Sequence, residues 1–355
     1  MLMTITWAAE RGIELGPLFL RYYQILFFIG FVVGFYLMKR YFQKAGVSQD
    51  VLDNLLIYTV LATIIGARLG HVFFYDWDYY SANPIEIFKP WKGGLASHGA
   101  AIVIPTVLYL FARRYKKELG HSFLWLMDRV VITVALAGAL IRLGNFANSE
   151  IYGEPENGPM ETVYLRPVMD NVEDYFSDKV TSMEFVPTGN ILSTDSLELP
   201  EYEVIITPNS QVEQGALQST LEVHLIPSFN LQKKDNRHLY IPENTELQAN
   251  ENGTYSFAAY GIPRAPSQLY ESFGYAVIFI LLFLLGERGH LHKEGRIFGL
   301  FMLCIFGFRF AIEFIKANQK AFESSMTLNM GQWLSIPLIV AGAFLFIRSL
   351  KSKAE

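Results

Sequence analysis

The chain has 355 residues, of which 51% are hydrophobic and 15% aromatic, while charged residues make up only 18%. Long uncharged runs recur along it, which predicts a polytopic membrane protein and excludes a soluble domain. The single cysteine, Cys304, lies inside an apolar run, which excludes a disulfide framework and a cysteine-based metal site. The net charge is −5 and no basic patch occurs, so no nucleic-acid partner is expected.

Apolar runs of about 20 residues, the length that crosses roughly 30 Å of hydrocarbon, predict an all-α polytopic protein with seven transmembrane helices. The predicted spans are residues 20–38, 54–74, 95–112, 123–146, 267–286, 296–316 and 330–348. The first run is long and is followed by Lys39 and Arg40, which indicates a retained span and not a cleaved signal peptide.

Basic residues set the expected orientation, because short cytoplasmic loops are enriched in lysine and arginine. Thirteen of them follow the first, third, fifth and seventh runs, and alternation places these segments on one side: Lys39, Arg40, Lys44, Arg113, Arg114, Lys116, Lys117, Arg288, Lys293, Arg296, Arg348, Lys351 and Lys353. That side is expected to be cytoplasmic, with the N-terminus outside and the C-terminus inside.

The composition changes between the fourth and fifth runs. Residues 154–262 contain 18 Asp and Glu against 5 Lys and Arg, a net charge of −13. Short alternating runs at 202–207, 221–226 and 238–241 predict β-strands, and so a small β-rich domain outside the membrane. The expected domains are the first four helices, this insertion and the last three helices, over residues 1–153, 154–262 and 263–355.

Several charged residues are predicted at membrane depth, where each costs roughly 2.5–3.5 kcal/mol at the centre of a helix. From a rise of about 1.5 Å per residue, Arg68 and Arg309 lie roughly 20 Å across from the inner side, and Glu313 is one turn further out. Arg142 lies at the outer end of the fourth run. The remaining polar residues enter their runs from the outer side: Tyr23, His98 and Glu271. Polar groups from several helices are therefore expected to converge in the outer half of the bilayer.

Each of these residues also has a structural interpretation. Arg309 and Glu313, four apart, are compatible with a purely structural ion pair, and Asn145 and Asn148 with hydrogen bonds to a neighbouring helix. His98 is compatible with a satisfied interfacial histidine. Several arginines at one depth are better explained by an anion, and the planar fork of arginine suits lipid phosphate.

At these residues the chain resembles the prolipoprotein diacylglyceryl transferase family of bacterial inner-membrane enzymes. The segment 142–153 is close to the family signature. Further matching segments follow one another in the family's order and cover nearly the whole membrane part: residues 21–23, 66–70, 93–99, 266–271, 295–299, 309–314 and 330–337. Three features depart from the family: Ile141 and Ala100 stand where glycine is usual, and the insertion 154–262 is much longer than the usual connection.

The resemblance implies a reaction and its partners. The family transfers the sn-1,2-diacylglyceryl group of phosphatidylglycerol to the lipobox cysteine thiol of a prolipoprotein, forming a thioether and releasing glycerol 1-phosphate. The implied partners are phosphatidylglycerol, prolipoprotein signal peptides and membrane lipids. The implied location is the inner membrane, with the active site toward the periplasmic half. No metal and no other cofactor is expected.

The nucleophile then comes from the substrate, and a base must favour its thiolate. His98 is the first candidate for that base, because its ordinary pKa suits proton transfer near neutrality, and Glu150 is the alternative. Arg142 and Arg309 are expected to stabilise the phosphate leaving group. Further residues are expected to bind phosphatidylglycerol or to orient the arginines: Tyr23, Arg68, Asn145, Gly153 and Glu313.

Two other classes of protein compete with this interpretation. A transporter or lipid flippase also collects arginines and carboxylates, but the polar set here lies on one side and no paired broken helices occur at a midplane. A scaffold protein would act through its outer β-rich domain. The insertion itself is either a solvated decoration or a docking surface for preproteins.

Overall fold

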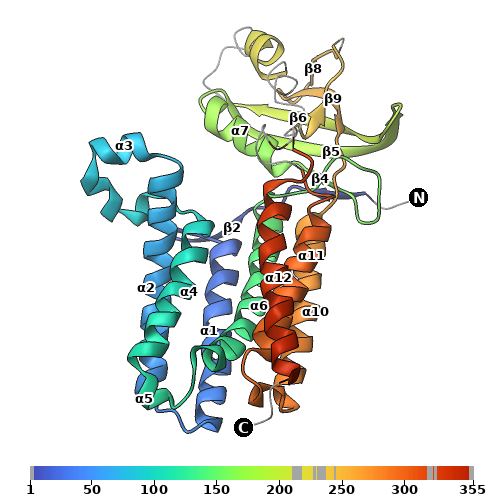
Figure 1. Cartoon of the computed structure of the whole chain (residues 1–355). Helices are drawn as coiled ribbons and strands as arrows, with labels where there is room; N and C mark the ends of the chain where they lie inside the picture. Colours follow the sequence, from blue (N-terminus) through green and yellow to red (C-terminus); the bar gives the residue numbers. More distant parts are fainter. Residues whose placement is uncertain are drawn as a thin grey trace. The chain divides into compact units, whose positions relative to one another are not determined.

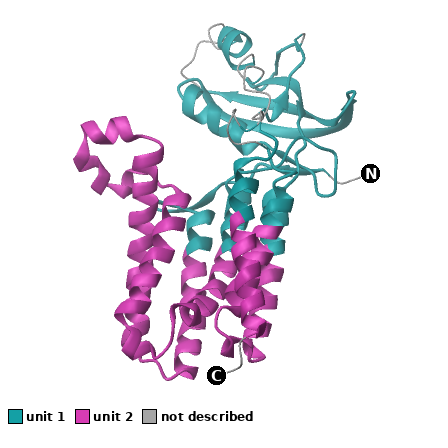
Figure 2. Ribbon diagram, in the orientation of Figure 1, with its two compact units in different colours: residues 1–27, 138–274, 308–336 teal, residues 28–137, 275–307, 337–355 magenta. Residues whose placement is uncertain are grey.

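The computed structural model describes residues 4–209, 218–226, 229, 237–243, 245–317, 323 and 326–351. The chain forms two compact units, each built from three separate stretches of sequence (Figure 2). The first unit contains residues 1–27, 138–274 and 308–336, and the second contains 28–137, 275–307 and 337–355. The boundaries between the units cross long helices, and the expected domain limits at residues 153 and 263 stay a prediction.

Each predicted apolar run overlaps a long helix (Figure 1). The helices are α1 (Tyr22–Lys44), α2 (Gln49–Phe74), α4 (Ser97–Arg114), α6 (Phe123–Ala147), α10 (Ser267–Glu287), α11 (Arg296–Ile312) and α12 (Met330–Lys351). Among the described residues, five of these helices are long and apolar enough to cross a membrane, namely α1, α2, α6, α10 and α12. The chain is therefore a multi-pass membrane protein, while the count of seven spans and their orientation stay predictions.

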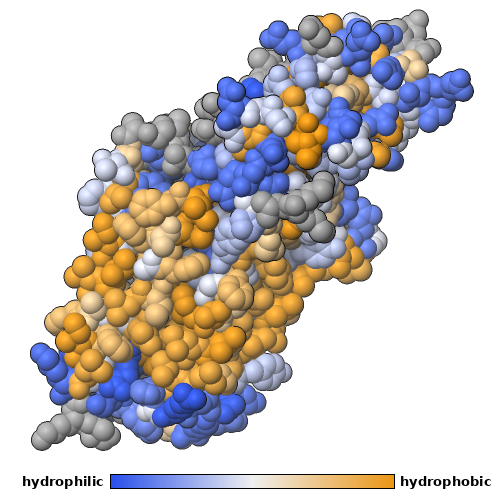
Figure 3. Space-filling view, turned by 90° about the vertical axis from the view of Figure 1, so that its right-hand side faces the viewer, coloured by the Kyte–Doolittle hydropathy of each residue, from blue (hydrophilic) through white to orange (hydrophobic). Residues whose placement is uncertain are grey.

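The helices expose large apolar side chains along their length. Phe28 on α1 and Phe344 on α12 are each about two-thirds exposed, at 68% and 65%. Figure 3 shows hydrophobic side chains covering the helical part on the face in view. Apolar surface of this extent suits contact with acyl chains and not with water.

In the second unit, helices α2 and α4 cross with their backbones in direct contact. A Cβ atom on Gly99 would lie 2.5 Å from the Cα of Gly70 and 2.2 Å from the carbonyl oxygen of Gly66. Small residues at such crossings let membrane helices approach closely. The shared end of the two helices carries the short helices α3 (Trp77–Ala82), η1 (Pro84–Phe88) and η2 (Pro90–Lys92). Two other short elements lie elsewhere in the unit, α5 (Lys116–Leu119) and η5 (His290–His292).

The insertion is β-rich, as predicted. Its elements are β4 (Thr162–Tyr164), α7 (Arg166–Phe176), β5 (Val180–Ser193), β6 (Glu198–Pro208), η3 (Leu221–Leu225), β7 (Leu239–Tyr240), β8 (Gln248–Ala249) and β9 (Tyr255–Gly261). The larger sheet is antiparallel in the order β5-β6-β9-β7, and β8 also pairs with β9. Val204 and Ile206 of β6 alternate with exposed or half-buried neighbours and share one hydrophobic core with Val168 and Val172 of α7. This core holds the sheet and the helix together.

Two of the three predicted strands are confirmed and one is wrong. Residues 202–207 lie in β6, and residues 238–241 overlap β7. Residues 221–226 are helical instead. Leu221 and Leu225 are buried while Val223 is exposed, and apolar residues four apart share one face of a helix. The pattern of these six residues fits both the period of a strand and that of a helix, so it cannot decide between the two structures.

The N-terminal segment joins the insertion, which the sequence analysis did not predict. Strand β1 (Ile5–Trp7) pairs in parallel with β4, and β2 (Gly12–Leu15) forms a hairpin with β3 (Leu18–Arg21) that leads into α1. Arg166 at the start of α7 forms ion pairs with Glu10, Asp170 and Glu173. The chain before α1 is thus tied to the insertion by backbone pairing and by charge.

His238, which precedes β7, contacts the loop after α6. Its Nε2 lies 3.1 Å from the hydroxyl of Tyr152, and its side chain is buried. Burial and the neighbouring charge of Arg264 lower the pKa of His238 from 6.5 to about 3. Between pH 6.5 and about 3, the imidazole is therefore neutral in the folded chain and protonated in the unfolded chain.

The stability of the protein should consequently fall in acid. Because the folded pKa of His238 lies below the unfolded one, its contribution is complete above pH 6.5 and is lost as the pH falls toward 3. The loss is at most about 1.4 kcal/mol per pH unit. Thermal unfolding midpoints in detergent over this range, for the wild type and His238→Gln, measure it. The glutamine variant should show a shallower decline, and equal slopes would contradict the assignment.

Candidate active site

The site begins at the C-terminal end of α6, in the first unit. Arg142 and Asn145 are three residues apart and therefore share a face of the helix. The Nη1 of Arg142 donates to the side-chain oxygen of Asn145 at 3.2 Å, and the amide of Asn145 donates to Glu150 at 2.8 Å. Asn148 also donates to Glu150, at 3.2 Å. An arginine, an asparagine and an exposed carboxylate thus form one hydrogen-bonded chain.

The loop that carries Glu150 is strained. Ser149 and Ile151, on either side of it, have φ angles of 54° and 60°. Left-handed backbone is unfavourable for residues other than glycine, above all for a β-branched one, and such residues are concentrated at functional sites. The carbonyls of Glu150 and Ile151 accept hydrogen bonds from Gln268 and Ser267 at the start of α10. These bonds hold the loop in its unfavourable conformation.

Tyr164 of β4 supports the same loop through its hydrogen bond to Gln268. Its hydroxyl donates to Gln268 at 3.1 Å, and its side chain is fully buried. Burial raises the pKa of Tyr164, so the hydroxyl stays protonated and remains a donor. The contact connects the insertion to Gln268, which in turn holds the carbonyl of Glu150.

Gly153 lies where three backbone segments meet. Its N–H donates to the carbonyl of Ala265, and the N–H of Glu154 donates to that of Ile315. A Cβ atom on Gly153 would lie 2.5 Å from the Cβ of Ala265 and 2.7 Å from the carbonyl oxygen of Ile315. Only glycine therefore fits between the segments that precede α10 and follow α11.

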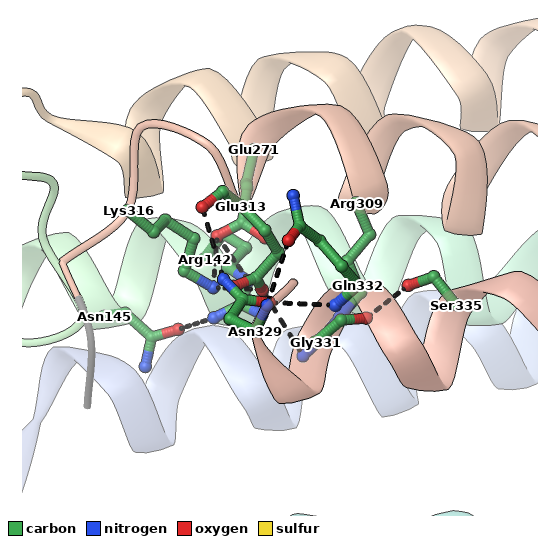
Figure 4. Close-up of polar contacts among 10 residues, drawn as sticks. All are labelled: Arg142, Asn145, Glu271, Arg309, Glu313, Lys316, Asn329, Gly331, Gln332 and Ser335. Atoms are coloured by element: carbon green, nitrogen blue, oxygen red, sulfur yellow. Dashed lines mark hydrogen bonds and ion pairs between the residues drawn. The ribbon is translucent and has the colours of Figure 1, made fainter. Parts of the chain in front are cut away.

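A network of charged side chains, of which Glu271 and Lys316 are buried, joins the ends of α6, α10 and α11 (Figure 4). The carboxylate of Glu271 is fully buried and lies 3.2 Å from Arg142 and 3.8 Å from Lys316. Lys316 also contacts Glu313 at 2.9 Å, and Glu313 lies 3.6 Å from Arg309. Three cations share two carboxylates by direct contact, and a third carboxylate, that of Glu150, is connected to Arg142 through Asn145.

Glu313 lies against the start of α12. Asn329 caps this helix reciprocally with Gln332, since the N–H of each residue donates to the side-chain oxygen of the other. The amide of Asn329 also donates to Glu313 at 3.1 Å. A Cβ atom on Gly331 would lie 2.5 Å from the carboxyl carbon of Glu313. The glycine thus leaves the space in which the carboxylate meets its partners.

The structure brings together Arg142, Asn145, Glu150, Arg309 and Glu313 of the predicted set. Gly153 pairs with the backbone of Lys316. Tyr23, near the start of α1, lies close to Gly144, where a Cβ atom would meet its ring at 2.9 Å.

Two predicted residues, Arg68 and His98, belong to the second unit. His98 is exposed at the start of α4 beside the rings of Phe74 and Tyr75. Arg68 is buried and donates to backbone carbonyls of the segment that follows α2. The roles assigned to both residues stay predictions.

Lys316 and Asn329 were missed by the sequence analysis, while Glu271 and Gln332 lie in segments that resemble the family but were given no role. The available signal for Lys316 was its spacing of three from Glu313, which places two opposite charges on one face. The signal for Asn329 was the N-cap pattern of an asparagine followed three residues later by glutamine. Among the described residues, no group of His, Cys, Asp and Glu side chains could hold a metal ion.

Comparison with known proteins gives this site a family context. The family model for prolipoprotein diacylglyceryl transferase matches residues 11–348. The chain belongs to this family. A phosphatidylglycerol–prolipoprotein diacylglyceryl transferase of Tolumonas auensis is 32% identical over 343 residues, which cover 97% of this chain and 96% of the relative. Relatives of the same name from Porphyromonas gingivalis and Bacteroides fragilis are 31% and 27% identical over 93% and 100% of this chain, and over 89% and 98% of their own lengths.

Removal of the Lys316 charge should destabilise the transferase strongly. Breaking a buried charge pair from one side costs about 3–5 kcal/mol, because the remaining charges stay buried. Lys316→Met should therefore lower the thermal unfolding midpoint in detergent, while Lys316→Arg should restore much of it. Lys92→Met is the matched control, since Lys92 is an exposed partner of Glu86 and such pairs contribute little. A Lys316→Met midpoint equal to that of Lys92→Met would refute a structural role for the network.

Proposed function

We propose that this chain transfers the sn-1,2-diacylglyceryl group of phosphatidylglycerol to the lipobox cysteine of prolipoproteins, the first step of lipoprotein maturation. The observation that carries the proposal is the charged network in which Glu271 and Glu313 hold Arg142 and Arg309. Membership of the family and the names of the relatives support the same reaction. The planar guanidinium groups of Arg142 and Arg309 suit an anionic phosphate group.

We further propose that all seven long helices span the bacterial inner membrane, with the N-terminus outside and the C-terminus in the cytoplasm. Supporting this are the thirteen basic residues that follow alternate helices. The site then lies toward the periplasmic half, where the lipobox cysteine is presented after translocation. The proposed domains are residues 1–153, 154–262 and 263–355, and the insertion is either a solvated decoration or a docking surface for preproteins.

In the proposed mechanism, Arg142 and Arg309 bind the phosphate of the lipid headgroup. The thiolate sulfur of the preprotein attacks the diacylglyceryl carbon that bears the phosphate ester oxygen. A carbon–sulfur bond forms, the carbon–oxygen bond breaks, and glycerol 1-phosphate leaves with the bonding pair. The two guanidinium groups stabilise the charge that develops on the phosphate, and exclusion of water strengthens their effect.

The other residues of the cluster position the arginines or the lipid. Glu271 and Glu313 orient Arg142 and Arg309, and Lys316 keeps the two carboxylates together. Asn145 and Tyr23 are proposed donors to phosphate or glycerol oxygens, and Gly153 is proposed to allow either a tight turn or a close approach of the chain to the lipid. Either His98 or Glu150 accepts the thiol proton before attack.

Replacement of Arg142 tests the role of the guanidinium group. The assay combines proteoliposomes, phosphatidylglycerol labelled in its glyceryl headgroup and a lipobox peptide, and it measures headgroup release. Arg142→Ala should abolish release, and Arg142→Lys should restore little, because lysine lacks the planar fork. A peptide with serine in place of the cysteine controls for simple hydrolysis. Full activity of folded Arg142→Ala would overturn the mechanism, and cysteine-independent release by the wild type would overturn the proposed reaction.

The pH profile of two variants identifies the base. If His98 takes the proton, His98→Gln should lose the rise of kcat/KM with pH, while Glu150→Gln should keep it. If Glu150 takes the proton, the two outcomes are exchanged. Loss of rate without a change in profile indicates a residue that only positions others. A His98→Gln variant with a normal rate near neutral pH would exclude His98 as the base.

A further inference from the structure

The segment between α2 and α4, residues 75–95 and here called the arm, is built around Arg68. This arginine is buried in the second unit, 5% exposed. Its Nε donates to the carbonyl of Ile87 at 2.9 Å, and Nη1 donates to those of Gly93 and Gly94 at 2.6 and 3.1 Å. Nη2 donates to the carbonyl of Glu86. Four bonds from one guanidinium to the backbone of a single segment fix the path of that segment.

Two further contacts complete the clamp. The guanidinium lies over the ring of Tyr80 of α3, 4.8 Å from its centroid. Gly94 has a φ angle of +72°, and a Cβ atom there would lie 2.7 Å from Nη1 of Arg68. The loop therefore closes on the arginine from both ends of the arm. Almost all of the N–H donors of Arg68 are therefore engaged by backbone carbonyls of the arm.

The arm presents large apolar side chains outward. Ile85, Phe88 and Trp91 are 73%, 78% and 77% exposed, and Trp77 and Tyr79 are about half exposed. This surface continues onto Phe73 and Phe74 at the end of α2, which are also exposed and belong to a candidate membrane span. Exposed aromatic residues beside the end of a spanning helix are typical of the boundary between lipid headgroups and acyl chains.

The charges of the arm indicate which surface it meets. It contains three carboxylates, of Asp76, Asp78 and Glu86, and two lysines. Lys89 and Lys92 both contact the carboxylate of Glu86, at 2.6 and 2.9 Å. Because the lysines are paired and the arm has a small net negative charge, the arm does not attract anionic headgroups. Its attraction to lipid therefore comes from its aromatic and aliphatic side chains.

We propose that the arm is an interfacial membrane anchor, and that Arg68 acts as its clamp, holding the aromatic side chains in position to enter the lipid boundary. The occupant of the surface is the bilayer itself, of any headgroup charge. Arg68 is then a positioning residue for this anchor. The proposal does not depend on the transfer reaction, because it concerns the second unit and is read out by lipid contact.

Spin labelling tests the anchor, since the chain has one cysteine, Cys304, which Cys304→Ser removes. Nitroxide labels at Trp91→Cys and Phe88→Cys, in proteoliposomes, are exposed to oxygen, which concentrates in lipid, and to a nickel chelate, which stays in water. Both labels should favour oxygen, as should the lipid-facing control Val340→Cys on α12. Ser182→Cys on the exposed face of β5 should favour the chelate. An arm label that behaves like the one at 182, or that neither reagent reaches, overturns the proposal; the second case indicates cover by a second copy or another protein.

Arg68→Gln in the Trp91→Cys chain tests the clamp. The label should become more mobile, and its ratio of oxygen to chelate access should fall toward that of the Ser182→Cys control. If this variant does not fold, Gly94→Ala tests the same contact, because its Cβ is directed at Nη1 and its φ angle is strained for alanine. Unchanged mobility and access in a folded variant would overturn the role of Arg68.

Discussion

The site depends on one fully buried carboxylate, that of Glu271, and on the cations that neutralise it. Burying an ion costs several kcal/mol, and the contacts of Arg142 and Lys316 with Glu271 offset this cost. Lys316 also forms an ion pair with Glu313. Glu313 in turn contacts Arg309 and accepts a hydrogen bond from Asn329 at the start of α12. These contacts fix the ends of α6, α10, α11 and α12 relative to one another. Hydrophobic packing alone would not fix them in this way.

The strained loop after α6 follows from this fixed frame. Each left-handed residue beside Glu150 costs of order 1–3 kcal/mol, which a loop in free solution would relieve. Here the carbonyls on the loop are held by Ser267 and Gln268, and Gly153 is enclosed by the segments before α10 and after α11. The result is an exposed carboxylate kept beside Asn145, in a position that no regular helix end would give it.

The sequence predicted the parts whose cause is local. Apolar run length located the long helices, and the 142–153 segment contains Arg142, Asn145 and Glu150, which the structure joins by hydrogen bonds. The missed features arise from contacts distant in sequence: β1 pairs with β4 across more than 150 residues, and Lys316 acquires its importance from Glu271. The strand predicted at residues 221–226 was wrong for a different reason. Six residues of this pattern fit both a strand and a helical turn, and only the burial of their side chains in the folded chain distinguishes the two.

The predicted depth in the membrane grouped three arginines whose hydrogen-bond partners differ. Arg68 spends its donors on four backbone carbonyls, so its charge serves the path of the chain. Among the described residues, Arg142 makes one side-chain hydrogen bond and one ion pair, and Arg309, a third exposed, makes a single ion pair at 3.6 Å. A guanidinium can bind phosphate only with donors that the protein leaves available. Arg142 and Arg309 therefore keep more donors available for an anion than Arg68 does, a distinction that depends on the partners of each donor and not on its distance across the bilayer.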